Sequence, residues 1–288
     1  MKLAAAAYPL DWFDSFAEWE AKLTRWVAEA LDQGAELLVF PEYAAMELSS
    51  LGGAAVAADY EASMRETARH ADAVEAAHDR LARHHGVTIL AASAPHFPID
   101  GGRPVNRACL YGPSGVIGHQ DKQIMTRFER QDWDVVPGCD GLKAFDTPIG
   151  RVGIVICYDS EFPLLARALV DQGADILLAP SATETLAGFH RVRIGSQARA
   201  LENQCVVLQA PIVGPCDFCP AVGGGNGSAA IYGPPDLGFP DTGILAETAL
   251  NVPGWAIAEI DPATIARVRV EGNVLNHAHW PEQADRLR

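Results

Sequence analysis

Three polar side chains able to act on a carbonyl compound each follow a stretch of the sequence that is predicted to be a strand. Glu42 and Cys157 come directly after apolar runs, and Lys122 comes after a stretch of alternating polarity. Because sites in α/β sheets gather at the carboxyl ends of strands, we expect these side chains to lie close together. A carboxylate can accept the thiol proton, the thiolate can attack a carbonyl carbon, and an ammonium group can stabilise the developing oxyanion. The pattern therefore predicts acyl transfer, although each charged residue taken alone is more typical of a solvated strand end.

Cys157 lies between a predicted buried strand, residues 151–156, and a predicted helix that begins near Glu161. The strand is a β-branched apolar run, and the apolar residues that follow Glu161 have helical spacing. A side chain at such a turn projects from the backbone, as in hydrolases whose nucleophile sits on a strand–turn–helix elbow. The helix N-terminus is expected to favour the thiolate. The alternative is a structural thiol, because free cysteine is among the most buried residue types.

The elements that must position these residues alternate between strand and helix. Apolar runs and alternating patterns predict strands at residues 2–8, 37–40, 87–93, 103–111, 116–121, 142–147, 151–156, 175–179, 205–209, 228–232, 243–247 and 255–260. Periodicity of three and four predicts helices at residues 12–30, over most of 54–85, after 161 and at 187–203. This order is typical of an α/β fold. Residues 122–141 have no sustained period and are predicted to form a long loop, which in a compact domain is usually functional.

Composition excludes several classes of protein. The 288 residues are 49% hydrophobic and carry a formal net charge of −15, which argues against nucleic acid or an anionic membrane as partner. No apolar run reaches the roughly 20 residues that a membrane-spanning helix requires. The short apolar N-terminus is followed at once by acidic residues, which favours a first strand over a signal peptide. Six cysteines are too few for a disulfide scaffold of this size, so we expect a cytoplasmic protein.

Short motifs spread along the chain resemble the nitrilase superfamily of carbon–nitrogen hydrolases. They occur in the order of that family: Phe40-Pro41-Glu42, Asp121-Lys122-Gln123, Cys157-Tyr158-Asp159 with Phe162-Pro163, Arg199 to Gln204, and Asn226-Gly227-Ser228 followed by Ile231 and Gly233-Pro234. A single motif would be a weak signal, but five in order over residues 2–270 are a specific one. The resemblance implies a single-domain four-layer α-β-β-α sandwich at residues 1–270, a C-terminal extension at 271–288, and a homodimer or larger homo-oligomer.

The resemblance also implies roles for individual residues and a reaction that needs neither metal nor cofactor. Cys157 would be the nucleophile, Glu42 the general base, and Lys122 the cation beside the tetrahedral intermediate, with the backbone N–H of Tyr158 completing the oxyanion hole. Glu129 matches the second glutamate of many family members, and Glu47 and Glu161 are the other candidates for that role. The implied reaction is hydrolysis of a small amide through a thioester on Cys157.

The residues around the nucleophile do not identify the substrate. Cys157-Tyr158-Asp159 resembles the amidase and carbamoylase branches more than the nitrilases, which have Cys-Trp-Glu. Ser160 and Glu161 replace the arginines that hold the carboxylate of N-carbamoyl amino acids, and His190, Arg191 and Arg193 are the alternative clamp. Ala179-Pro180-Ser181 replaces the usual Asn-Pro pair. We predict Tyr158, Glu161 and Ser181 as substrate-binding residues, and a small neutral or cationic amide as substrate.

Several rival interpretations remain at this point. An N-carbamoyl-amine hydrolase or an acyltransferase to an amine would share the same thioester, and a catalytically silent binding protein would share the fold. Cys216 and Cys219 have the spacing of half a zinc or redox site, to which His277 and His279 could contribute. No second cysteine pair follows, so we interpret all four as loop residues. The glycine-rich stretch 223–227 lacks the Lys-Ser/Thr of a phosphate loop and is interpreted as a turn.

Overall fold

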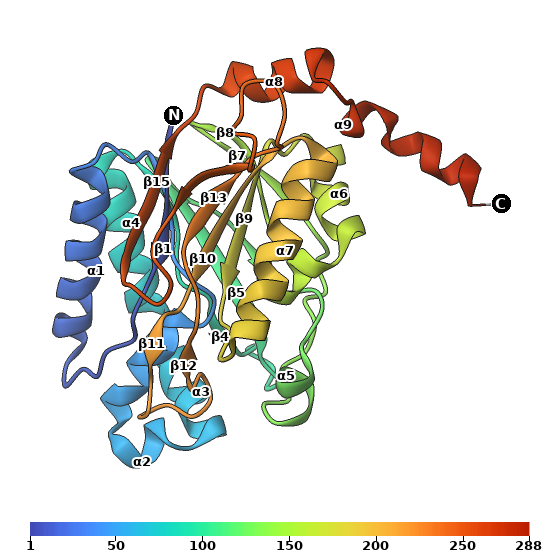
Figure 1. The fold of residues 1–288 in the computed structure, drawn as a ribbon. Helices are drawn as coiled ribbons and strands as arrows, with labels where there is room; N and C mark the ends of the chain where they lie inside the picture. Colours follow the sequence, from blue (N-terminus) through green and yellow to red (C-terminus); the bar gives the residue numbers. More distant parts are fainter. Residues whose placement is uncertain (288) are drawn as a thin grey trace.

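The strands of the chain pair into two sheets that pack face to face. The computed structural model describes residues 1–287, and helices cover the outer face of each sheet, which gives four layers in the order α-β-β-α (Figure 1). The α-β-β-α sandwich expected from the sequence is therefore confirmed. None of the helices in residues 1–287 is both long and apolar enough to cross a membrane.

The strand order within each sheet mixes parallel and antiparallel neighbours. The first sheet runs β15 (Gly254–Glu259), β1 (Lys2–Ala7), β2 (Leu37–Val39), β3 (Thr88–Leu90), β5 (Val105–Gly112) and β4 (Ala94–His96), and β6 (Gly115–Asp121) forms a hairpin with β5. The second runs β14 (Ile244–Glu247), β13 (Ala230–Tyr232), β10 (Val206–Pro211), β9 (Ile176–Ser181), β8 (Gly150–Ile154) and β7 (Ala144–Thr147). A short ladder joins β11 (Gly214–Pro215) to β12 (Gly224–Gly225).

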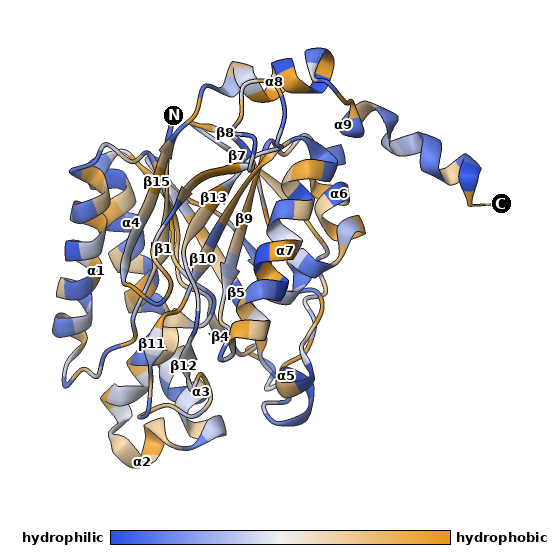
Figure 2. Ribbon diagram, viewed as in Figure 1, coloured by the Kyte–Doolittle hydropathy of each residue, from blue (hydrophilic) through white to orange (hydrophobic). Residues whose placement is uncertain are grey.

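Side chains that point to alternate faces of the strands form the core between the two sheets. In β1, Leu3 and Ala5 belong to the apolar cluster between the two sheets, whereas Ala4 and Ala6 belong to the cluster beneath the helices. Successive side chains of a strand point to opposite faces, which explains why strands buried on both sides are apolar throughout. The strands are mostly orange in Figure 2, whereas the helices outside them carry both colours.

Four helices form the outer layers. The first sheet is covered by α1 (Phe16–Leu31) and α4 (Ala71–His85), and the second by α6 (Pro163–Asp171) and α7 (Leu186–Asn203) (Figure 1). The helix predicted from residue 12 begins only at Phe16, because the side chain of Ser15 accepts a hydrogen bond from the Glu18 N–H and caps the helix.

Several short elements were not predicted. They are η1 (Ala44–Gly52), β4, α5 (Arg127–Gln131), β11, β12, α8 (Pro262–Glu271), α9 (Asn276–His279) and η3 (Trp280–Arg286), and the predicted helical stretch 54–85 is divided into α2 (Ala54–Ala57), α3 (Tyr60–Arg69) and α4. The element after Cys157 is also different, since a 3₁₀ helix, η2 (Cys157–Glu161), precedes α6. Five of these elements, β4, α5, β11, β12 and α9, have fewer than about six residues and show too little periodicity to be found in this way.

The C-terminal residues lead away from the sandwich. Helix α8 still buries Ile265 and Val268, and Figure 1 shows α9 and η3 extending outward beyond it. The predicted boundary between a domain at 1–270 and an extension at 271–288 stays a prediction.

Candidate active site

Lys122 joins two glutamates inside the protein. It follows β6, its side chain is 1% exposed, and its Nζ lies 2.7 Å from Glu42 Oε1 and 2.7 Å from Glu129 Oε2. Burial lowers the pKa of the Lys122 ammonium, but the charges of Glu129 and Glu42 outweigh it and the net pKa is raised well above its ordinary value. Lys122 is therefore a permanently charged ammonium group between two carboxylates.

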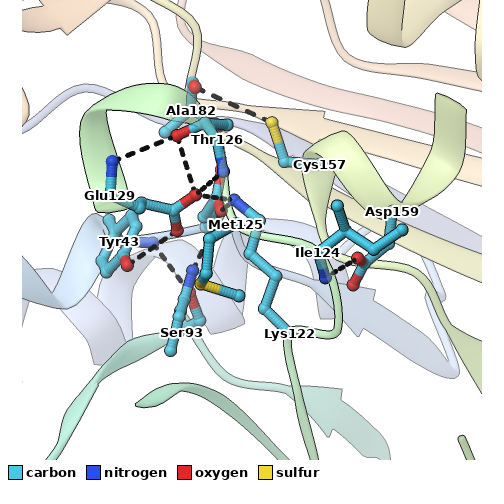
Figure 3. Close-up of polar contacts among 12 residues, drawn as sticks. Tyr43, Ser93, Lys122, Ile124, Met125, Thr126, Glu129, Cys157, Asp159 and Ala182 are labelled. Carbon is cyan, nitrogen blue, oxygen red and sulfur yellow. Dashed lines mark hydrogen bonds and ion pairs between the residues drawn. The ribbon is translucent and has the colours of Figure 1, made fainter. Parts of the chain in front are cut away.

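Glu129 is held by the helix on which it lies. Thr126 and Glu129 form a capping box at the start of α5, and the Thr126 N–H and Oγ1 donate to Glu129 Oε2 at 2.8 and 2.9 Å (Figure 3). Tyr43 Oη donates to Glu129 Oε1 at 2.9 Å. Burial raises the pKa of Glu129, but the charge of Lys122 and these hydrogen bonds outweigh it and lower the pKa. Glu129 stays ionised and anchors Lys122.

Glu42 lies beyond the end of β2 and accepts three hydrogen bonds. Besides Lys122, Asn106 Nδ2 donates to Glu42 Oε1 at 2.9 Å, and the N–H of Ala182 donates to Glu42 Oε2 at 3.0 Å. Three donors, one of them the charged Lys122 ammonium, favour the carboxylate form of Glu42. Its pKa is nevertheless raised, because burial outweighs the opposing effect of Lys122. A carboxylate with raised proton affinity is suited to general base catalysis.

Cys157 is the first residue of η2 and has a left-handed backbone conformation. Its φ is 49°, a conformation that costs energy for a residue with a side chain and that is concentrated at functional sites. The thiol donates to the carbonyl oxygen of Ala182 over 3.8 Å (Figure 3). Because Ala182 also binds Glu42 through its N–H, one peptide segment contacts both the thiol and the carboxylate.

The prediction that a helix N-terminus stabilises the thiolate of Cys157 is wrong for the resting protein. Burial and the negative charge of Glu42 raise the pKa of the Cys157 thiol well above its ordinary value, and the opposing effect of Lys122 is smaller. The short η2 replaces the expected longer helix at this point. The raised pKa favours the thiol form of Cys157 over the thiolate.

Asp159 connects the cysteine turn to the lysine loop. It is fully buried, and its carboxylate accepts hydrogen bonds from the backbone N–H groups of Gln123 and Ile124 at 3.1 and 2.8 Å (Figure 3). Burial raises the pKa of Asp159 to about 7. These two bonds fix the backbone immediately after Lys122 relative to the nucleophile.

A cavity of about 460 Å³ opens onto these groups, and its size suits a small molecule. Glu42, Lys122, Cys157 and Glu129 all line it, as the sequence predicted. Aromatic and small apolar residues are half of the remaining lining residues: Tyr43, Phe128, Trp133, Tyr158, Ala182, Val192, Ala221 and Val222. The predicted chemical groups thus meet in one partly apolar space.

The structure places two of the three predicted substrate-binding residues at the cavity. Tyr158 and Glu161 line the cavity, but Ser181 is not among its lining residues in 1–287. The Ser181 hydroxyl is fully buried and donates to the carbonyl of Ala210 at 3.4 Å, so the interpretation of Ser181 as a pocket residue is wrong. It is the next residue, Ala182, just beyond the end of β9, that lines the cavity.

The predicted arginine clamp is not assembled. Arg191 lines the cavity, but its Nε lies 3.4 Å from Glu161 Oε1. Arg193 pairs with Glu247, and His190 is exposed outside the lining residues of 1–287. The positive charges that are available for a substrate carboxylate are thus reduced.

Glu47, another candidate for the second glutamate, belongs to a separate buried cluster. Its Oε2 lies 2.7 Å from Lys22 Nζ, and its Oε1 accepts from Tyr8 Oη at 2.9 Å. Burial raises the pKa of Glu47, and the charge of Lys22 opposes this. Glu47 is not among the cavity-lining residues of 1–287 and connects the N-terminal segment to η1.

Cys216 and Cys219 are buried free thiols near β11. Helix α9, which contains His277 and His279, lies at the opposite end of the molecule in Figure 1. Within residues 1–287 no group of three or more His, Cys, Asp or Glu side chains is placed to hold a metal ion. The cysteine pair lies in the loop that supplies Ala221 and Val222 to the cavity wall.

Four residues that contact the predicted ones were not found in the sequence: Tyr43, Asn106, Thr126 and Asp159. One signal was present, because Thr126-Arg-Phe-Glu129 has the spacing of a capping box. Asn106 lies next to Arg107 in a strand of mixed polarity and does not stand out. Tyr43 and Asp159 adjoin predicted site residues, but only the fold shows what they contact.

Comparison with known proteins places the chain in a family. The family model described as carbon-nitrogen hydrolase matches residues 2–270. A probable hydrolase, YhcX, of Bacillus subtilis is 33% identical over 274 residues, which are 95% of this chain but 52% of the relative, so the chain spans about half of that protein. A deaminated glutathione amidase of Synechocystis sp. is 32% identical over 86% of this chain and 88% of its own.

Solved structures agree with this assignment at the level of the fold. A carbon-nitrogen hydrolase from Helicobacter pylori superposes with a TM-score of 0.76 at 19% identity, over 99% of this chain and 94% of that one. The match over nearly the whole chain establishes that this protein belongs to the carbon–nitrogen hydrolase family.

Proposed function

We propose that the protein hydrolyses the carbon–nitrogen bond of a small amide through a thioester on Cys157. The observation that carries the proposal is the meeting of Glu42, Lys122 and Cys157 at one cavity, with Lys122 Nζ 2.7 Å from Glu42 Oε1. A base, a cation and a thiol at one wall of a partly apolar cavity are the groups that acyl transfer requires.

In the first step, Glu42 takes the proton of the Cys157 thiol as the sulfur attacks the amide carbon. The negative charge that develops on the amide oxygen is stabilised by Lys122 and by the backbone N–H of Tyr158. The carbon–nitrogen bond then breaks, and the leaving nitrogen takes the proton from Glu42 and departs as ammonia or an amine. A thioester remains on Cys157, and Glu42 is again a carboxylate.

In the second step, Glu42 takes a proton from water while the water oxygen attacks the thioester carbon. Collapse of the resulting intermediate breaks the carbon–sulfur bond, releases the carboxylic acid and returns the proton to the sulfur. Glu129 remains ionised throughout and keeps the Lys122 ammonium in place, so Glu129 is a positioning residue.

The proposal also includes a homo-oligomeric enzyme of the cytoplasm. The family resemblance supports the oligomer. Six free cysteines, five of them buried or half-buried, are compatible with a reducing compartment.

Intact-mass spectrometry during turnover of a mixed library of primary amides tests the thioester. We expect the wild-type protein to gain the mass of an acyl group, and Cys157→Ala to gain none. Because the added mass equals that of the acyl group less the thiol hydrogen that it replaces, the same spectrum identifies the acyl part of the substrate. Release of ammonia by the wild type with an undiminished rate in Cys157→Ala would overturn the mechanism.

The pH profile tests Glu42 as the base. Since the pKa of Glu42 is raised by burial, kcat/KM is expected to fall on the acid side with an apparent pKa above the ordinary value of about 4.3. In Asn106→Ala one donor to the carboxylate is lost, so this limb should move to higher pH and kcat/KM should fall about tenfold. An acid limb that is identical in both proteins would show that Asn106 does not position Glu42.

A further inference from the structure

The charged side chains that line the cavity are mostly neutralised by one another. The lining residues include four carboxylates and three cations. Lys122 is shared by Glu42 and Glu129, and Arg191 lies 3.4 Å from Glu161. These contacts leave the inner cavity with an excess of negative charge, because one ammonium group faces two carboxylates.

Glu184 is the lining carboxylate without a cationic partner among residues 1–287. It lies in the segment between β9 and α7, and its carboxylate lies against the loop before β12, since a Cβ at Gly223 would come within 2.9 Å of Glu184 Oε1. Burial is the cause of its raised pKa, and no neighbouring cation opposes it. The side chain of Glu184 is exposed and has no cationic partner among residues 1–287, so its carboxylate is available to a ligand.

The cations at the cavity do not balance its carboxylates. Arg191 pairs with Glu161, whereas Arg127 has no carboxylate partner among residues 1–287 and donates through Nε to the neutral Gln131 Oε1 at 2.7 Å on the exposed surface of α5. The formal net charge of −15 gives the whole protein a negative field, which attracts cationic ligands and repels anionic ones. The excess of carboxylates over cations at the cavity and the overall field therefore favour the same sign of ligand.

We propose that the cavity takes an amide whose far end carries a protonated amine, and that Glu184 binds this amine. The inference rests on the proposed amide hydrolysis and adds the class of substrate to it. The amide group would lie against Cys157, Glu42 and Lys122, while the ammonium group would lie at Glu184. Glu184 is thus a specificity-determining residue for the cationic end.

Three amides of matched length test the preference: 4-aminobutanamide, which is cationic, pentanamide, which is neutral, and the monoamide of glutaric acid, which is anionic. We expect kcat/KM for ammonia release to be highest for the cation and lowest for the anion. A highest kcat/KM for the anion, reduced in Arg127→Gln, would overturn the proposal in favour of carboxylate recognition.

Glu184→Gln tests the residue itself. We expect it to lower the ratio of kcat/KM between 4-aminobutanamide and pentanamide about tenfold, because a charge-assisted hydrogen bond is lost. Asp241→Asn is the matched control, since it removes one exposed negative charge outside the cavity-lining residues. An equal loss in both variants would show that only the overall charge matters and would overturn the role of Glu184.

Binding to Cys157→Ala separates this proposal from the proposed hydrolysis. Calorimetric titration of that variant with 4-aminobutanamide should show tighter binding than with pentanamide, and the difference should vanish in Cys157→Ala/Glu184→Gln. If wild type releases no ammonia from any amide yet this difference is present, the hydrolysis fails and the cation site stands. Equal binding of the two amides would overturn the cation site.

Discussion

Replacing Lys122 with methionine is expected to destabilise the protein by about 3 to 5 kcal/mol, because removing one partner of a buried ion pair leaves uncompensated charge. Here two carboxylates, Glu42 and Glu129, would be left facing each other without their shared cation. Turnover should fall about 10³-fold or more with the loss of the group that stabilises the oxyanion. Urea unfolding and ammonia release measure the two effects.

The destabilisation should depend on pH in a defined direction. In the wild type the pKa of Glu129 is lowered, so Glu129 contributes stability above its unfolded pKa, and this contribution is lost as pH falls through the folded pKa. Without Lys122 the pKa values of both glutamates should be raised, so the variant should gain stability as pH falls toward their unfolded values. The difference from wild type is therefore expected to be larger at pH 8 than at pH 5.5.

A second substitution and a surface control separate stability from catalysis. Lys122→Met/Glu129→Gln removes one of the unpaired charges and should recover part of the stability but none of the activity. Lys143→Met removes an exposed lysine that pairs with Asp140 and should change stability by less than about 0.5 kcal/mol. A Lys122→Met protein as stable as wild type at pH 8 would contradict the buried ion triad.

Glu42→Gln is expected to lower kcat/KM about 10⁴-fold, because residues that act as a unit fail together when one is removed. The amide of glutamine cannot accept the thiol proton as a base. At the same time the charge that raises the pKa of Cys157 is removed, so the thiol pKa should fall. The rate of alkylation by iodoacetamide as a function of pH measures that pKa, and ammonia release measures the activity.

The matched control is Glu47→Gln. Glu47 is also buried, and it also pairs with a lysine, Lys22, but in a cluster away from the cavity. We expect it to reduce stability while the folded protein keeps its kcat. An activity of Glu42→Gln within tenfold of wild type would show that another group acts as the base.

The long elements of this fold were predictable because burial on both faces leaves a clear pattern. Strand β9 is apolar over most of its length, and α1 repeats its buried residues at three and four. The start of α1 depended on the cap at Ser15 instead, and α5 is too short to show a period. The capping box at Thr126 is a local signal for α5, whereas the lack of a sustained period predicted a loop at residues 122–141.

The chemical groups of the site were predictable, but the groups that orient them were not. Glu42, Lys122 and Cys157 stand out because each follows a strand. Asn106 contacts Glu42 through its side-chain amide, but the sequence does not show which residue that amide contacts. Ala182 contacts Glu42 through its backbone N–H, which its residue type cannot predict. The sequence also predicted a thiolate at Cys157, whereas the pKa of its thiol is raised. That pKa depends on burial and on the nearby charge of Glu42, which only the folded chain shows.

The site draws on both sheets. Glu42 and Lys122 follow strands of the first sheet, whereas Cys157 follows β8 of the second. A partly folded chain in which either sheet stands alone would possess no complete centre, so its thiol would meet no partner able to activate it. Enzymatic activity in this protein therefore requires that the two sheets have packed together. The rate at which activity recovers during refolding would measure the rate of that packing step.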